Sequence, residues 1–162
     1  MRTVIGVMGS GQPLSKHAYD MAYRLGALIA KHGWVLLTGG TASGVMDAAS
    51  RGAHEAGGLV IGVLRGPDGA EASSYVDVRI RTGMGDARNV INVLSSDVVV
   101  ALPGGPGTLS EVALALKSRK PVIVVGWDPG PAIRASGHGR LFDAQSAEDA
   151  VKIAQRVLLG DV

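Results

Sequence analysis

Hydrophobic residues form short uninterrupted runs, separated by longer stretches in which apolar positions recur every three or four residues. Uninterrupted β-branched runs are typical of strands buried on both faces, whereas the wider spacing is typical of amphipathic helices. The runs predict strands at Thr3–Met8, Val35–Thr38, Leu59–Leu64, Val76–Ile80, Asp97–Leu102 and Val122–Val125. The wider spacing predicts helices at Leu14–Lys31, Gly44–Ala56, Ala87–Ser95, Thr108–Ser118 and Ala147–Leu159.

The alternation of strand and helix predicts the fold class. Buried parallel strands need helices on both faces, so we expect an α/β protein, a Rossmann-like three-layer sandwich with a mostly parallel sheet. No internal repeat or second apolar core is present, and residues 1–162 are therefore expected to form one ligand-binding domain. The longer loops at 65–75 and 126–140 are either solvated connections or lids over a site.

Composition narrows the class of function. The chain is 46% hydrophobic and 19% charged, which is typical of a compact globular protein. Its 16 Lys and Arg residues are scattered and nearly balanced by 14 Asp and Glu residues, so nucleic acid is not an expected partner. The chain has no cysteine, and its four histidines lack paired metal-ligand spacing, so no protein-ligated metal is expected.

Hydropathy also bears on location. No apolar run approaches the roughly 20 residues that cross a bilayer. The chain opens at Met1 and passes directly into a predicted strand, without the apolar stretch of a secretory signal. We therefore expect a cytoplasmic protein without a membrane partner.

Residues 98–111 run from a buried strand through a glycine-rich turn into a helix. Gly104, Gly105 and Gly107 let the backbone turn with its N–H groups outward. Thr108 is expected to cap the helix. A phosphate placed there would meet free N–H donors, the positive end of a helix dipole and the Thr108 hydroxyl. The stretch therefore predicts a phosphorylated small-molecule ligand.

Further glycine turns occur along the chain. Ligands of open parallel sheets bind beyond the carboxyl ends of the strands, so these turns are expected to share one pocket with the turn within residues 98–111. They contain Gly9, Ser10 and Gly11; Gly39, Gly40 and Thr41; and Gly83, Met84 and Gly85. Neither the G-x-G-x-x-G fingerprint nor a P-loop motif is present, which disfavours NAD and P-loop nucleotide binding.

Two ionisable side chains are candidates for chemistry. Arg88 lies near the start of its predicted helix, where a cation opposes the dipole unless it meets an anion. It either binds the ligand or forms a surface pair with Asp86 or Asp97. Glu111 lies three residues after Thr108, the spacing of a capping box. The alternatives for Glu111 are acid–base catalysis and orientation of the ligand.

Two predicted helices are apolar on nearly every side. They are Asn89–Ser95 and Thr108–Ser118. One side suffices to cover a sheet, so the excess predicts a two-fold homodimer interface, with a buried monomer core as the alternative. Growth of the dimer to a tetramer stays open.

Residues 103–111 read Pro-Gly-Gly-Pro-Gly-Thr-Leu-Ser-Glu and resemble the P-G-G-x-G-T-x-x-E signature of the Lonely-guy phosphoribohydrolases, often misnamed lysine decarboxylases. Within that superfamily the whole chain resembles most the molybdenum cofactor carrier proteins. The segments that carry this second resemblance are residues 33–40, 44–49 and 82–89, which span nearly all of the predicted sheet.

The resemblance to the carriers implies a non-catalytic protein that binds a phosphorylated pterin with dithiolene-bound molybdenum and protects it until transfer to a molybdoenzyme. The metal would arrive within this ligand. It also implies that Gly104–Thr108 hold the phosphate, that Arg88 offsets negative charge, and that Gly9–Gly11 and Gly39–Thr41 donate N–H groups.

The resemblance to the hydrolases implies instead a nucleoside 5′-monophosphate phosphoribohydrolase of the cytokinin-activating type. Arg88 would position phosphate and ribose, and Glu111 would support departure of the base. The hydrolases usually carry Met-His-Glu before an Arg-Lys pair, whereas here Asp86 and Ala87 precede Arg88 and Asn89 follows it. A sensor that binds a nucleotide-like metabolite without turnover is a third hypothesis.

Overall fold

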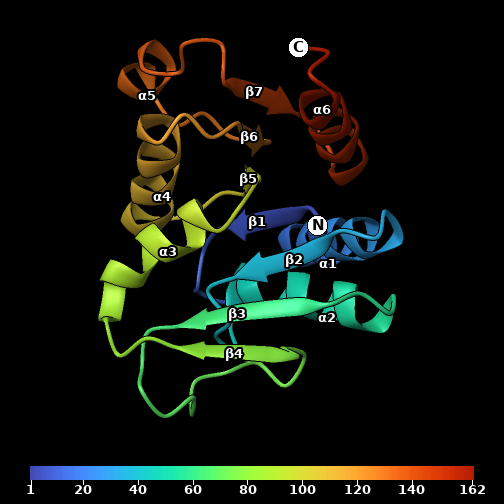
Figure 1. Ribbon diagram of the computed structural model, residues 1–162, viewed down its shortest axis with the longest axis vertical. Helices are drawn as coiled ribbons and strands as arrows, with labels where there is room; N and C mark the ends of the chain where they lie inside the picture. The colour runs from blue at the N-terminus through green and yellow to red at the C-terminus, as the bar shows by residue number, and fades with distance from the viewer.

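The computed structural model describes all residues from 1 to 162 and contains one seven-stranded sheet in the order β4-β3-β2-β1-β5-β6-β7 (Figure 1). Every strand pairing is parallel, so the predicted α/β sandwich is confirmed. The strands are β1 (Val4–Met8), β2 (Val35–Thr38), β3 (Val60–Leu64), β4 (Val78–Arg81), β5 (Val98–Ala101), β6 (Val122–Val125) and β7 (Leu141–Ala144). The helices are α1 (Lys16–Lys31), α2 (Gly44–Glu55), the 3-10 turn η1 (Gly85–Arg88), α3 (Asn89–Leu94), α4 (Pro106–Lys117), α5 (Pro131–Ala135) and α6 (Ala147–Leu159).

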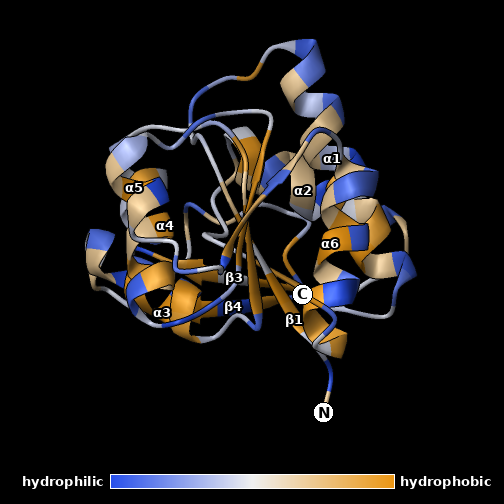
Figure 2. Cartoon of the chain, turned by 90° about the horizontal axis from the view of Figure 1, so that it is seen from above, coloured by the Kyte–Doolittle hydropathy of each residue, from blue (hydrophilic) through white to orange (hydrophobic).

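Helices cover both faces of the sheet, with α1, α2 and α6 on one side and α3, α4 and α5 on the other (Figure 2). Successive strand residues point to opposite faces, which explains why the strands read as uninterrupted apolar runs. On β2, for example, Leu36 joins the 22-residue core under α1, α2 and α6, and Leu37 joins the 11-residue core under α3 and α4. No helix is both long and apolar enough to cross a membrane.

Several predicted boundaries are wrong for identifiable reasons. Strand β7 was not predicted because Asp143 interrupts its apolar run, and helix α5 was not predicted because five residues are too few for a helical period to be recognised. Helix α5 lies within the stretch 126–140 that was expected to be a loop. Helix α4 begins at Pro106, with Gly105 as its N-cap, because proline is favoured in the first turn. The predicted helix Ala87–Ser95 is divided between η1 and α3.

Strand β1 lies between β2 and β5, so the direction in which the chain adds strands reverses there. Loops that leave such a switch point separate and open a crevice at the carboxyl edge of the sheet. The loop after β1 is held in that crevice by the Ser10 backbone, whose N–H donates to Pro103 O at 3.2 Å. The Ser10 carbonyl accepts from the Val45 N–H at 2.8 Å. The first turns of α2 and α4 are thereby fixed on either side of this loop.

Candidate functional site

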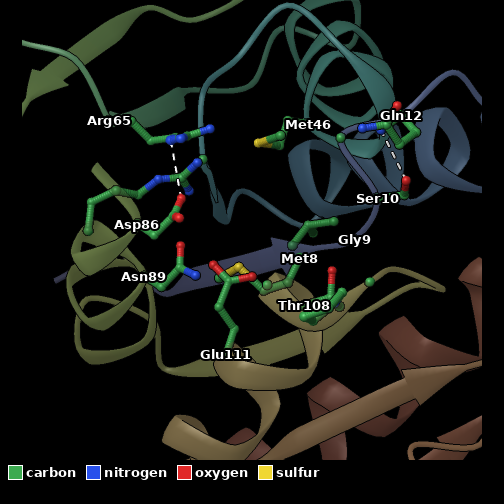
Figure 3. Close-up of a pocket in the computed structure, with 17 residues that line it drawn as sticks. Met8, Gly9, Ser10, Gln12, Met46, Arg65, Asp86, Asn89, Thr108 and Glu111 are labelled. Atoms are coloured by element: carbon green, nitrogen blue, oxygen red, sulfur yellow. Dashed lines mark hydrogen bonds and ion pairs between the residues drawn. The ribbon is translucent and has the colours of Figure 1, made fainter. Parts of the chain in front are cut away.

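A cavity of about 420 Å³ opens at the carboxyl edge of the sheet and is lined by 17 residues (Figure 3). Its walls come from the loop after β1, from the residues that follow β2 and β3, from η1 and from the first turns of α2 and α4. The protein contains no group of three or more His, Asp or Glu side chains placed to hold a metal ion.

The floor of the pocket is the N-terminus of α4. No protein atom accepts the N–H groups of Gly104, Gly105, Gly107 or Thr108, and the first turn closes with Leu109 N–H donating to Gly105 O at 3.1 Å. The N-cap Gly105 has no side chain to satisfy these donors. This helix end therefore presents free donors and the positive end of its dipole, which together favour an anion.

Thr108 is not the helix cap, contrary to the sequence prediction. Since α4 begins at Pro106, Thr108 lies in the first turn and is buried. Its Oγ1 packs against Gly104, where even a Cβ atom would collide with it. The capping-box interpretation of Glu111 is therefore wrong as well, because it requires Thr108 to be the cap.

Arg88 is a buried cation without an ion pair. The residue is only 6% exposed, and its Nε atom has no hydrogen-bond partner. The guanidinium lies against the Gly39 backbone, where a Cβ would collide with Nη1. Burial lowers the pKa of Arg88, and the Glu111 carboxylate opposes this effect. An arginine nevertheless stays protonated in a protein, so the charge persists and needs an anion.

The surface-pair alternative for Arg88 is wrong. Asp86 pairs instead with Arg65, with 3.2 Å between Oδ1 and Nε. Asp97 accepts the Val4 N–H at 2.8 Å and thereby supports the start of β1. Neither carboxylate is an ion-pair partner of Arg88, and the ligand role of Arg88 stays a prediction.

Glu111 is buried on the α4 side of the same pocket. Its Oε1 accepts a hydrogen bond from Asn92 Nδ2 at 2.9 Å. Burial raises the pKa of Glu111 to about 7, although the Asn92 hydrogen bond and the Arg88 charge both act to lower it. At neutral pH this carboxyl therefore exists in both protonation states, which suits either proton transfer or contact with an anion.

The remaining predicted residues fall into two groups. Gly9, Ser10, Gly11 and Gly39 line the cavity, and Thr41 lines an adjoining one. Gly40, Gly83, Met84 and Gly104 lie outside both linings. Protein acceptors take the N–H groups of the first three: Thr38 Oγ1, Gly66 O and Thr82 Oγ1, respectively. The structure thus unites the turns after β1, β2 and β5 but not the one at 83–85.

Sequence reasoning missed several pocket residues. They are Met8, Gln12, Met46, Arg65 and Asp86. A signal existed for Arg65, because it directly follows β3 and the carboxyl ends of parallel strands share one edge. No comparable signal marked Met46, since methionine is most often a core residue.

The loop at 65–75 is anchored rather than free. The Glu71 carboxylate accepts the N–H groups of Arg65 and Gly66 at 2.6 and 2.9 Å. Its backbone pairs with the turn after β2, through Ala42 N–H to Glu71 O and Ser73 N–H to Gly40 O. These bonds favour the connecting interpretation of this loop over the lid.

Known proteins share this architecture. The molybdenum cofactor binding protein of the phototrophic bacterium Rippkaea orientalis is 46% identical, with a TM-score of 0.94 over 98% of both chains. The molybdenum cofactor carrier protein of Chlamydomonas reinhardtii is also 46% identical, with a TM-score of 0.92 over 98% of this chain and 99% of that one. A cytokinin riboside 5′-monophosphate phosphoribohydrolase of Mycobacterium tuberculosis is 30% identical over 148 residues, or 85% of this chain and 78% of that protein.

These similarities confirm the resemblance to the carrier proteins and to the wider Lonely-guy superfamily. The model of the SLOG cluster4 family matches residues 2–156, which include every strand of the sheet and every residue that lines the pocket. The chain therefore belongs to the SLOG cluster4 family.

Proposed function

We propose that this protein binds, protects and carries molybdenum cofactor. One observation carries the proposal: a buried, unpaired Arg88 faces the same cavity as the free N–H groups at the start of α4. A buried charge without a partner costs stability, so an anionic ligand explains why the arrangement is tolerated. The TM-score of 0.94 to the molybdenum cofactor binding protein of R. orientalis supports this ligand over other anions.

The pocket suits such a ligand in size and chemistry. Its volume of about 420 Å³ lies in the range of small-molecule sites, roughly 300–1,000 Å³. The phosphate of the pterin would rest on Gly105, Gly107 and Thr108 beside Arg88, and Gly9, Gly11 and Gly39 line the rest of the cavity. With no cysteine, the chain offers no thiolate to compete with the dithiolene for molybdenum. Transfer to a molybdoenzyme in the cytoplasm would complete this role.

A second candidate function is hydrolysis of nucleoside 5′-monophosphates. Glu111, with a pKa of about 7, lines the same cavity as Arg88, and a mycobacterial relative is a phosphoribohydrolase. In this reaction the N-glycosidic bond breaks, the base leaves with a proton, and water adds to C1′ of the ribose. Arg88 would hold the phosphate while the Glu111 carboxylate stabilised the positive charge that develops on the sugar.

The exposed side of α3 and α4 supports a two-fold dimer as part of this proposal. Val90, Leu94 and Leu109 are 41%, 56% and 38% exposed, although they belong to helices that already bury apolar residues against the sheet. The expected alternative, a fully buried monomer core, does not account for these side chains. We propose that a second copy of the chain covers them.

Replacing Arg88 with Met is expected to weaken binding of released molybdenum cofactor at least about tenfold, because a charge-assisted contact is lost. The thermal midpoint of the unliganded protein should stay equal or rise, because an unpaired buried charge is removed. Anaerobic fluorescence titration, cofactor half-life and calorimetry measure these effects, with Arg79→Met on the exposed strand β4 as the matched control. Wild-type protein that protects the cofactor no better than an inert protein contradicts the carrier function.

Glu111→Gln separates the two candidate functions. A carrier should keep its affinity for the cofactor, because glutamine preserves the shape and neutrality of the protonated side chain. A hydrolase should lose release of free base from AMP and cytokinin monophosphates, measured by chromatography. If wild-type protein releases no base above the protein-free background, hydrolysis of these substrates is eliminated.

The raised pKa of Glu111 makes stability depend on pH. Between its ordinary value of 4.5 and about 7, the folded protein keeps the proton that the unfolded chain releases. The contribution of Glu111 to the free energy of unfolding of the wild-type protein therefore declines as pH rises through that window. Glu111→Gln should melt about 10 °C above wild type at pH 8 and close to it at pH 4. A difference between the two melting temperatures that is constant with pH would rule out the raised pKa.

Leu94→Asp is expected to convert a dimer into a 16.5 kDa monomer, because it places a charge in the apolar contact. Light scattering after size-exclusion chromatography gives the mass. Leu159→Asp, at the exposed end of α6, is the matched control and should remain dimeric. A monomeric wild-type protein contradicts the proposed interface, whereas a mass of four chains extends it to a tetramer.

A further inference from the structure

A second cavity of about 410 Å³ adjoins the pocket. Gly11, Gln12, Met46, Arg65 and Arg88 line both cavities, and the other walls of the second are Thr41, Ala42, Ser43 and Glu71. In Figure 3, Arg65, Met46 and Gln12 lie along one wall of the hollow, and Asn89, Glu111 and Thr108 lie along the opposite wall. The two cavities are therefore parts of one hollow that meet at Arg88.

The second cavity lies at the N-terminus of α2, where backbone N–H groups lack acceptors as they do at the N-terminus of α4. Its N-cap residue Ser43 makes no side-chain cap hydrogen bond. No protein atom accepts the N–H groups of Gly44 and Met46, whereas Val45 donates to Ser10 O and Asp47 to Ser43 O. The helix has 12 residues, long enough for its dipole to act on an anion at this end.

Close packing keeps side chains away from this helix start. Gly44 adopts a φ of +56° and approaches the loop after β1 so closely that a Cβ would collide with Ser10 O. The one acidic side chain in the first turn, Asp47, accepts a hydrogen bond from Ser73 Oγ at 2.6 Å. The free N–H groups of α2 therefore have neither a cap nor a covering side chain from the turn that precedes them.

Arginine side chains give independent support for an anion here. Arg88, buried and without a hydrogen-bond partner at Nε, lines this cavity as well as the first. Arg65 uses Nε for Asp86, and no protein atom accepts its Nη1 or Nη2 groups. The carboxylate of Glu71, on the same wall, accepts the backbone N–H groups of Arg65 and Gly66 at Oε1, and its negative charge acts on Arg88 without forming an ion pair with it. Guanidinium donors therefore face the hollow from its midpoint and from the α2 side.

We infer that the hollow holds a ligand with two anionic groups, one at the N-terminus of each helix. The phosphate lies at α4, and a second oxyanion group lies at α2 between Arg65 and Arg88. This inference rests on the proposed binding of an anionic cofactor and assigns the opposite end of that ligand. The chemistry recognised is that of a compact group rich in anionic oxygen, which an oxo-molybdenum centre and a second phosphoryl group share.

The inference is tested by NMR titration of the ¹⁵N-labelled full chain with phosphate and, separately, with molybdate. The quantity measured is the change in chemical shift of each backbone amide. We expect two sets to shift, Gly105, Gly107 and Thr108 at α4 and Gly44 and Met46 at α2. Arg65→Gln should weaken the α2 set only about fivefold and leave the α4 set unchanged, because the Arg65 side chain is 51% exposed and water screens its charge. Arg65→Lys should restore most of the affinity, and Arg79→Gln should change neither set.

The outcomes separate this inference from the proposed function. Shifts confined to α4 overturn the second subsite and leave the carrier proposal intact. An α2 set that moves equally in Arg65→Gln overturns the assignment of Arg65. No shift at either helix overturns both proposals. Tighter binding of molybdate than of phosphate at α2 identifies the oxo-metal end of the ligand as the occupant, and the reverse order identifies a phosphoryl group.

Discussion

The buried charge of Arg88 is the constraint on which the rest of this site depends. Transfer of a guanidinium out of water costs several kcal/mol unless an anion compensates it. No carboxylate forms an ion pair with Arg88, and Glu111, on the opposite wall, is itself close to half-neutral at pH 7. The folded chain therefore bears an uncompensated free-energy cost of burying this charge, which an anionic ligand removes on binding. The site accordingly favours anions over neutral molecules of the same shape.

The parallel sheet explains how such a charge is held in place. Because β1 lies between β2 and β5, the loops that follow these strands meet at one edge, and the Ser10 backbone ties them together. Gly39, at the end of β2, leaves the space that the Arg88 guanidinium occupies. A larger residue at that position would displace the guanidinium, so the backbone of one strand sets the position of a side chain from a distant helix.

The sequence predicted most of this architecture, because buried parallel strands leave long apolar runs and glycine turns mark their ends. It predicted the wrong role for Thr108, since Pro106 and Thr108 both carry helix-start signals and the earlier one prevails. The burial of Arg88 depends on Gly39, which is remote in sequence, and no local pattern reveals such a contact. Arg65 could have been predicted from its place directly after β3, but its pairing with Asp86 of η1 joins segments that are remote in sequence and no local pattern reveals it.

The surroundings of Glu111 bear on the choice between carriage and hydrolysis. A carboxylate that stabilises a cationic sugar must be ionised, yet burial holds this group near pKa 7 with one hydrogen bond, from Asn92. Asn92 Oδ1 is buried without a partner, so rotation of its amide offers an acceptor for the protonated form of Glu111. A neutral carboxyl beside a bound phosphate avoids repulsion between like charges. The local chemistry of Glu111 thus favours holding an anion over cleaving a glycosidic bond.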